Sequence, residues 1–297
     1  MKKILLFLFV AALLGSSCEE EISSSTITKY NDRLVVNEYF NNNEPFSIQV
    51  SISKDAYKEP NPFVIDSTKV KLKLTENGVN IPLFYDDFAG VFNSLVKPQP
   101  GKRYELTASS SSYGTAFTSG LLPGDIDSKN SVCIENGGID MQGNKSDLLK
   151  LTFKDNAGTK DYYKLNFFYY SELVDKFNAF DFELKDILSA VNTIKTRDGG
   201  FLFSDESFSG KEKTFTAVPP FGIVSGNSKI KYLIQIQRLN DDFWKYNTSL
   251  EQYRGGLSGG GSGSNIFGGA VVVYTNIQNG LGIFAGSNIE SDTIKVK

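Results

Sequence analysis

Residues 70–78 have the sequence VKLKLTENG, in which apolar and polar residues alternate. Alternation with a period of two places the apolar side chains on one face and predicts a half-buried β-strand. Glu76-Asn77-Gly78 ends this stretch, and the Asn-Gly pair adopts the left-handed backbone of a tight hairpin turn. The apolar residues from Ile81 to Tyr85 then predict the returning strand of a β-hairpin.

Strand patterns continue on both sides of this hairpin. Phe46 to Ile52 alternates before it, and Tyr104 to Ala108 follows it after a turn at Pro100 and Gly101. Short strands at a spacing of about 8–12 residues, bounded by turn signals, predict an immunoglobulin-like β-sandwich. We expect this domain to span residues 33–125, because Leu122-Pro123-Gly124-Asp125 has the composition of an exit turn.

Residues 126–297 predict a larger β-rich domain with a sandwich or barrel-like architecture. We expect strands at Leu148–Phe153, Tyr162–Tyr170, Ile230–Gln237, Ala270–Tyr274 and Gly280–Ala285. The dense aromatic residues of the second of these strands favour a buried sheet, and a ligand-stacking platform is the alternative. The chain as a whole is therefore expected to be mainly β.

One or two short helices interrupt the β pattern. Residues 239–253 predict an amphipathic helix that Asn240 or Asp241 caps, with Phe243, Tyr246, Leu250 and Tyr253 on one face. Residues 171–191 are ambiguous between helix and strand. Within them, the apolar residues of 183–191 lie at helical spacing, so we expect a helix there.

The N-terminus has the pattern of a bacterial export signal. Residues 1–17 contain a basic start, an apolar run too short to span a bilayer and a small-residue end, as in a secretory signal peptide. Cys18 follows, as in the lipobox of lipoproteins, although Gly15 stands where that motif usually has leucine. We expect lipidation of Cys18 and a flexible tether over residues 18–32, with a plain secreted protein as the alternative.

The acidic run Glu19, Glu20 and Glu21 resembles the surface-export signal of Bacteroidota lipoproteins. A solvated acidic tether is the alternative explanation of the same three residues. We therefore expect a lipid-anchored protein of the outer membrane that faces the cell exterior.

Composition excludes several classes of chemistry. The chain of 297 residues has no histidine and a formal net charge of −3. Without histidine, Ser-His-Asp catalysis, Cys-His catalysis and histidine-ligated metal sites are excluded. An acidic chain without a basic stripe is not expected to bind nucleic acid.

Once Cys18 is acylated, Cys133 has no partner for an intrachain disulfide, so we expect a buried free thiol.

Acidic pairs are the remaining candidates for catalysis or metal binding. Asp86-Asp87, Asp205-Glu206 and Asp241-Asp242 are adjacent in sequence, which does not supply the separation of two carboxylates that glycoside hydrolysis needs. Asp125-Ile126-Asp127 offers two hard oxygens to calcium, but no further calcium-loop pattern follows it. The glycine-rich stretch 259–264 lacks the lysine of a phosphate-binding loop. We expect no catalytic residue, no metal and no cofactor.

Four motifs, in order along the chain, resemble one family. They are VNEYF within residues 35–40, PGKRYEL at 100–106, FSDESFSGK at 203–211 and YTNIQNGLGIF at 274–284. Together they are similar to the Bacteroidota lipoprotein family known as domain of unknown function 4249. This resemblance implies an outer-membrane lipoprotein associated with TonB-dependent receptors, and it implies no catalytic residues.

The function that these observations favour is a non-enzymatic accessory or substrate-capture partner of a TonB-dependent outer-membrane transporter. We expect Phe243, Trp244 and Tyr246 to contact this partner, together with the loop from Gly255 to Gly269; packing in the core is the alternative role of the aromatic residues. A stand-alone adhesin or glycan- or peptide-binding lipoprotein is the alternative function. A carboxylate-based hydrolase ranks below both.

Overall fold

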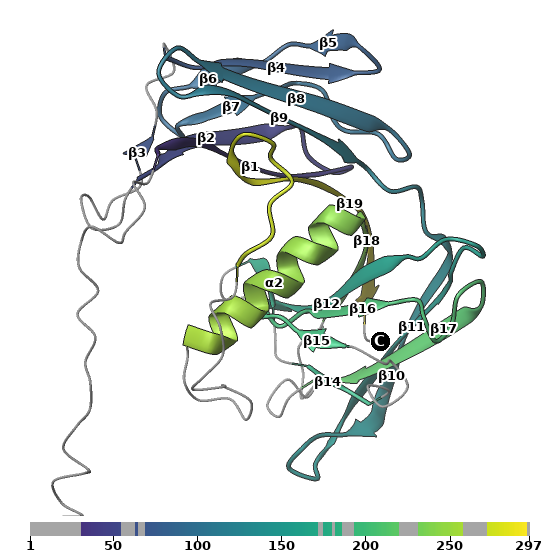
Figure 1. Cartoon of the computed structure of the whole chain (residues 1–297). Helices are drawn as coiled ribbons and strands as arrows, with labels where there is room; N and C mark the ends of the chain where they lie inside the picture. The colour runs from purple at the N-terminus through teal and green to yellow at the C-terminus, as the bar shows by residue number, and fades with distance from the viewer. Residues whose placement is uncertain are drawn as a thin grey trace, which may run out of the picture. The chain divides into compact units, whose positions relative to one another are not determined.

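The structure is a computed structural model that describes residues 31–54, 63–64, 69–171, 175–179, 182–185, 193–219, 231–257 and 272–295. The described residues from 33 to 53 and from 63 onward belong to one compact unit. They form three β-sheets and one helix, so the mainly β class is confirmed (Figure 1). The immunoglobulin-like arrangement and the domain boundaries stay predictions.

The long sheet joins strands from both halves of the chain. Its strands, in spatial order, are β15 (Ile194–Lys195), β16 (Phe201–Ser204), β12 (Tyr162–Ser171), β18 (Lys231–Leu239), β19 (Leu281–Lys295), β1 (Arg33–Asn41), β2 (Ser47–Ser53), β7 (Val91–Asn93) and β6 (Phe84–Asp86). Two further strands pair beside this row, β13 (Lys176–Ala179) with β12 and β3 (Phe63–Val64) with β2.

Two smaller sheets pack against the long one. The first contains β5 (Val79–Ile81), β4 (Lys71–Glu76), β8 (Arg103–Ser110) and β9 (Gly114–Leu121). The second contains β10 (Asp127–Ile139), β11 (Lys145–Lys154), β17 (Glu212–Val218) and β14 (Glu183–Leu184). Each small sheet shares an apolar core with the long sheet. One core includes Leu34, Leu74 and Phe284, and the other includes Leu151 and Phe167.

The predicted hairpin turn is confirmed, but the returning strand is Val79–Ile81 rather than Ile81 to Tyr85, because Phe84 and Tyr85 belong to β6 and pair with β7 in the long sheet. Strands β4 and β5 pair antiparallel, and the turn between them is Asn77-Gly78. Both turn residues have positive φ, 49° and 81°, which is the backbone that a two-residue hairpin with matching twist requires. The turn chemistry therefore fixes the register of this hairpin.

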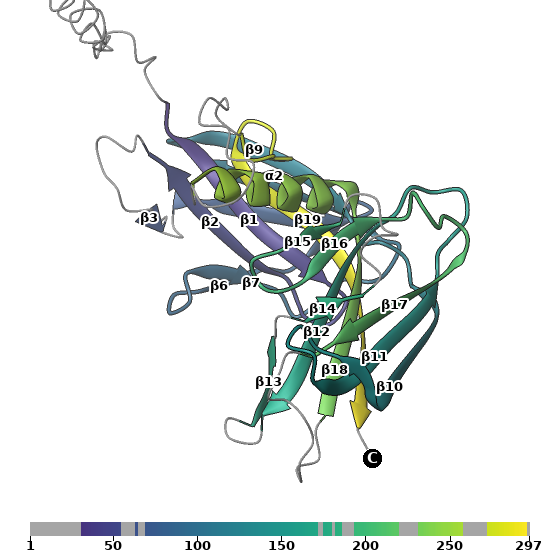
Figure 2. The same ribbon diagram turned by 90° about the horizontal axis from the view of Figure 1, so that it is seen from below.

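The last described strand pairs with the first. Strand β19 lies parallel to β1, with Val36 opposite Gly282, and antiparallel to β18 on its other edge. In Figure 2 the purple β1 and the yellow β19 lie side by side. The long sheet thus continues across the predicted boundary between residues 125 and 126, although the apolar cores on either side of that boundary remain distinct.

Strand β1 presents two different faces. Val36, Glu38 and Phe40 are buried in the first core, where Glu38 is an acid among apolar neighbours. Glu38 is only 6% exposed, and its Oε1 atom accepts a hydrogen bond from the Ser47 main-chain N–H at 3.1 Å. Tyr39 alternates to the opposite face, as the period of two dictates.

The helix α2 (Asp241–Leu257) confirms the helix predicted at 239–253, but it begins two residues later, after Leu239 ends β18, and it ends four residues later, at Leu257. Asn240 is the cap, because its Oδ1 atom accepts a hydrogen bond from the Phe243 main-chain N–H at 2.8 Å. The helix lies across the long sheet in Figure 2. Within the described residues, no helix is both long enough and apolar enough to cross a membrane.

Two secondary-structure predictions are wrong where the structure describes them. Glu183 and Leu184 form strand β14 rather than the start of a helix, because pairing with β17 outweighs local helical spacing. Residues 272–274 form no strand, although Ala270–Tyr274 is strongly apolar. The remainder of both stretches lies outside the described residues.

Candidate functional site

The predicted anchor lies outside the described residues. Signal residues 1–17, the lipidation site Cys18 and the acidic run Glu19, Glu20 and Glu21 all precede residue 31, where the described chain begins. Their roles in lipidation and surface export therefore stay predictions.

The three aromatic residues predicted to contact a partner hold α2 against the long sheet. Phe243 stacks on Tyr39 with ring centroids 5.1 Å apart, and Tyr246 meets the same ring edge-on at 5.7 Å. Trp244 stacks on Tyr162 at 4.8 Å. All three side chains are half-buried, so much of their surface serves the packing of the helix. The predicted contact loop lies mostly outside the described residues, and its first three residues, 255–257, are helical.

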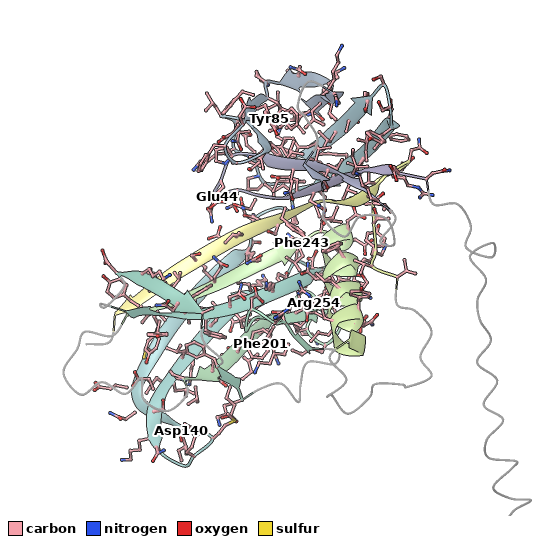
Figure 3. The ribbon with its side chains drawn as sticks, turned by 90° about the vertical axis from the view of Figure 1, so that its left-hand side faces the viewer. Glu44, Tyr85, Asp140, Phe201, Phe243 and Arg254 are labelled. Carbon is pink, nitrogen blue, oxygen red and sulfur yellow. The ribbon has the colours of Figure 1, made fainter. Side chains whose placement is uncertain are left out.

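A groove runs between α2 and the long sheet. It has a volume of about 450 Å³, and its apolar wall is formed by Tyr39, Phe243 and Leu250. Figure 3 shows Phe243 and Arg254 extending from the helix toward the strands. Tyr39 keeps 44% of its surface exposed, so its ring is accessible from the groove. Grooves of this size with aromatic walls bind small ligands.

The groove is also lined by charged side chains, from both the long sheet and α2. Lys164 pairs with Asp198 at 2.6 Å, and Arg254 pairs with Glu251 at 3.1 Å. Burial raises the pKa of Asp198, but hydrogen bonds from Lys164 and Thr196 outweigh this effect and hold the pKa below its ordinary value. Each of these two pairs combines one positive and one negative charge, so together they add no net charge to the groove.

Arg197 lines the same groove and is solvent-exposed. It forms no ion pair with any of the described residues. The groove thus offers one uncompensated guanidinium beside an aromatic wall, an arrangement suited to an anionic group on a ligand.

The acidic doublets predicted from sequence have structural roles in two cases. Asp86 caps a turn, since its Oδ1 atom accepts hydrogen bonds from the main-chain N–H groups of Phe88 and Ala89 at 2.9 and 3.0 Å. Asp241 and Asp242 lie at the start of α2, where acids interact favourably with the helix dipole.

Asp125 and Asp127, whose sequence offers hard oxygens to calcium but predicts no metal, have different side-chain partners. Asp125 Oδ1 accepts a hydrogen bond from Asn288 Nδ2 at 3.0 Å. Asp127 Oδ2 lies 3.3 Å from the side-chain nitrogen of Asn156. In this orientation of the amide, the Asn156 nitrogen donates to Asp127 and its oxygen accepts a hydrogen bond from Arg238. These two aspartates are solvent-exposed and bind different asparagines.

The third doublet takes part in a cluster that sequence reasoning missed. Asp205 lies beside Asp155 and Asp161, and one carboxylate oxygen from each lies within 4.8 Å of the others. Their exposed fractions are 2%, 1% and 7%, so the cluster is buried. Glu206, the other half of the doublet, is exposed and pairs with Lys160 at 2.7 Å.

The cluster is built from two loops. Asp155 and Asp161 bracket the turn between β11 and β12, and Asp205 opens the turn between β16 and β17. The Asp205 main-chain N–H donates to the Asp161 carbonyl at 3.0 Å, and the Gly210 N–H donates to Asp155 Oδ2 at 2.8 Å. One sequence signal could have indicated part of this site. Asp155 and Asp161 stand at the two ends of a turn that contains Gly158, between two strands that the sequence predicts.

Other side chains fix two of the three carboxylates. Tyr163 donates its hydroxyl to Asp155 Oδ1 at 2.6 Å, and Arg238 pairs with Asp161 Oδ2 at 2.7 Å. Burial raises the pKa of Asp205, a hydrogen bond that its carboxylate accepts from the Asp161 main chain opposes this, and the negative charge of Asp155 acts with burial to raise it. The Asp205 Oδ2 atom is buried and has no hydrogen-bond partner in the structure.

The thiol of Cys133 on β10 is free, but it is half-buried rather than buried as the sequence predicted. Burial, together with the nearby negative charge of Asp147, raises its pKa to about 12. A thiol with such a pKa carries almost no thiolate at neutral pH, so it is a poor nucleophile.

Comparison with known proteins identifies a family. The family model described as domain of unknown function (DUF4249) matches residues 19–293, which confirms the resemblance that the motifs predicted. No curated protein gives a significant match. A chain from the solved structure described as "Complete structure of manganese lipoxygenase of Gaeumannomyces graminis and partial structure of zonadhesin of Komagataella pastoris" shares 9% identity. That match covers 71% of this chain and 89% of that chain, and its TM-score of 0.19 is too low to support any argument.

Proposed function

The chain belongs to the family of domain of unknown function 4249, and on this basis we propose that it is a lipid-anchored, non-enzymatic protein of the outer membrane. Its role in this proposal is to capture a substrate for a TonB-dependent transporter. The proposed fold for this role is an immunoglobulin-like sandwich followed by a β-rich domain. Tyr39 of the sandwich and residues of the β-rich domain line the groove together.

The groove beside α2 is the observation that carries the proposal of capture. It combines an accessible aromatic wall at Tyr39 and Phe243 with the uncompensated guanidinium of Arg197. Such a surface binds an acidic sugar or peptide without changing it, because the aromatic rings stack on the ligand and the guanidinium pairs with its anionic group.

The buried carboxylates support a non-enzymatic role. Asp155, Asp161 and Asp205 are each less than a tenth exposed, so a polymer such as a polysaccharide cannot reach them in this structure. The half-buried thiol of Cys133, with its raised pKa, is likewise unsuited to nucleophilic attack.

The anchor and the partner in this proposal rest on the sequence. Cys18 supplies the lipid, and Glu19, Glu20 and Glu21 direct the protein to the cell surface. A tether beside a β-barrel raises the effective concentration of the contact, so a modest interface is sufficient. Phe243, Trp244 and Tyr246 contribute the surface that their packing against the sheet leaves exposed.

One experiment tests the anchor and the partner together. We expect affinity capture of the tagged full chain from detergent-solubilised outer membranes to recover a TonB-dependent barrel. The Cys18→Ala variant should leave the membrane fraction almost completely and recover no barrel, because it has lost the tether. Cys133→Ala is the matched control and should stay in the membrane fraction with its partner.

Recovery of the folded, membrane-bound wild-type protein without any barrel would favour the stand-alone binding protein. Retention of Cys18→Ala in the membrane fraction would contradict the lipid anchor.

The groove has its own test. We expect at least one member of a panel of acidic oligosaccharides and acidic peptides to raise the thermal unfolding midpoint of the full chain. Arg197→Ala should weaken that binding about tenfold or more, since a hydrogen bond to a charged group contributes about 1.5–3 kcal/mol. Arg103→Ala, an exposed arginine on β8, is the control. Equal binding by both variants would exclude the groove as the site of capture.

A further inference from the structure

The aspartate cluster has a charge that its protein neighbours do not balance. Asp155, Asp161 and Asp205 are buried together, and Arg238 is the cation that pairs with them in the part of the chain that the structure describes. When the three carboxylates are ionised, one guanidinium leaves a net charge of −2. Buried charge is costly unless it is paired. The cluster therefore lacks two positive charges.

Asp205 gives independent evidence of a missing ligand. Its Oδ2 atom is fully buried and has no hydrogen-bond partner, although the residue is only 2% exposed. Buried polar atoms in folded proteins are nearly always satisfied by protein, water or an ion, and an unsatisfied carboxylate oxygen is especially unfavourable. The same carboxylate has an oxygen within 4.8 Å of those of Asp155 and Asp161, so it faces the cluster.

From this geometry we infer that Asp155, Asp161 and Asp205 bind one calcium ion, independently of the proposed capture in the groove. Calcium binds carboxylate oxygens at 2.3–2.6 Å, so two oxygens on one ion lie at most about 5 Å apart. The 4.8 Å separation meets this limit. A divalent charge balances the net charge of the three acids and Arg238.

The chemistry of the donors selects calcium among the common metals. All three side chains offer hard oxygen atoms, and neither a nitrogen nor a sulfur ligand belongs to the cluster, so zinc and copper are disfavoured. Magnesium demands near-ideal octahedral geometry and keeps several waters, whereas calcium accepts irregular ligand sets. The residues that hold these oxygens come from two loops with no regular repeat, which favours calcium.

The ion would join the two loops that form the site. The turn that begins at Asp205 packs closely on the Asp155–Asp161 loop, because a Cβ atom added at Gly210 would lie 2.8 Å from the Cβ atom of Ala157. Gly210 also has φ of +70°, which disfavours any side chain there. Main-chain hydrogen bonds of Gly210 and Asp205 already connect the two loops. A calcium ion bound by all three carboxylates would also remove the repulsion between the negative charges of the two loops.

Thermal unfolding of the full chain tests the site. After dialysis against a chelator, calcium chloride at about 10 mM should raise the unfolding midpoint by about 3 °C or more, if the dissociation constant lies in the 0.1–1 mM range of extracellular modules. Asp205→Asn keeps the shape of the side chain and removes its charge, so it should abolish the shift. Asp87→Asn, the same substitution in an exposed turn, should keep the shift.

Terbium provides a direct readout of the same site. The Tyr163 hydroxyl lies 2.6 Å from Asp155 Oδ1, so a terbium ion in the cluster should be sensitised by tyrosine excitation. We expect this emission to fall when calcium is added in excess and to be lost in Asp205→Asn. If Asp205→Asn does not fold, the wild-type protein decides the question through terbium emission and its displacement by calcium.

Three outcomes would overturn the inference. One is a folded wild-type chain with neither a calcium-dependent midpoint nor tyrosine-sensitised emission. Another is an equal calcium shift in wild type and Asp205→Asn, which would place the ion elsewhere. The third is an equal shift with magnesium, which would indicate a general effect of divalent charge.

Discussion

Replacing Gly282 with alanine is expected to destabilise the protein by about 4 kcal/mol or more, a magnitude that marks severe backbone or packing conflict. Gly282 lies in β19 with φ of +103°, a region that residues with a side chain rarely occupy. A Cβ atom there would lie 2.0 Å from the carbonyl oxygen of Val36. That oxygen belongs to β1, so the substitution pushes apart the parallel pair that joins the two halves of the long sheet.

Urea unfolding of the purified full chain measures this effect. Gly255→Ala is the matched control, because a Cβ atom at Gly255 in α2 has no atom within 4 Å. Alanine is the better helix former, so the control should be neutral or more stable by up to about 1 kcal/mol. A Gly282→Ala protein as stable as wild type would show that β1 and β19 do not pair as described.

Glu38→Gln is expected to stabilise the protein by about 3 kcal/mol at pH 8 and to have little effect near pH 4. Burial of Glu38 among the apolar side chains of the first core raises its pKa from 4.5 to about 7, while the hydrogen bond from Ser47 lowers it. Glutamine keeps an oxygen that can accept that hydrogen bond and removes the charge.

The direction of the pH dependence follows from proton binding. Between pH 4.5 and about 7 the folded state holds the Glu38 proton more tightly than the unfolded state does. Stability therefore falls as pH rises through this range, and the loss is complete above the folded pKa. The contribution of Glu38 opposes that of ordinary paired carboxylates, which stabilise proteins as pH rises.

Unfolding free energies measured at several pH values check this prediction. Glu135→Gln, at an exposed position of β10, is the control and should follow the wild-type pH profile. A Glu38→Gln profile that runs parallel to wild type from pH 4 to 8 would exclude a raised pKa at Glu38.

Local patterns predicted local structure well. The hairpin at Asn77-Gly78 and the cap at Asn240 follow from interactions between residues only a few positions apart, and the structure confirms both. The strand at Glu183-Leu184 was missed because its partner is the distant strand β17. Helical spacing in sequence carries no information about such pairing.

The candidate sites were predictable only in part. The groove residue Phe243 was identified from the helix pattern, but its neighbours Tyr39 and Arg197 come from distant segments. Asp205 was noticed as one of a doublet, whereas its partners are Asp155 and Asp161 from another turn. Each site depends on strand order in the long sheet, and strand order depends on pairings that no local pattern specifies.

The pairing of β1 with β19 also governs how the protein reaches its folded state. Ile289 donates its N–H to Asn42 Oδ1 at 2.7 Å across 247 positions of sequence. The entropic cost of closing a loop grows only with the logarithm of its length, so this long loop costs only modestly more than a shorter one, but such distant contacts slow folding. Until β19 pairs with them, β1 and β18 each expose an edge with unpaired main-chain N–H and C=O groups that can pair with another chain. The protein should therefore fold slowly and aggregate from partly folded states, and a chaperone that shields these edges should raise its yield.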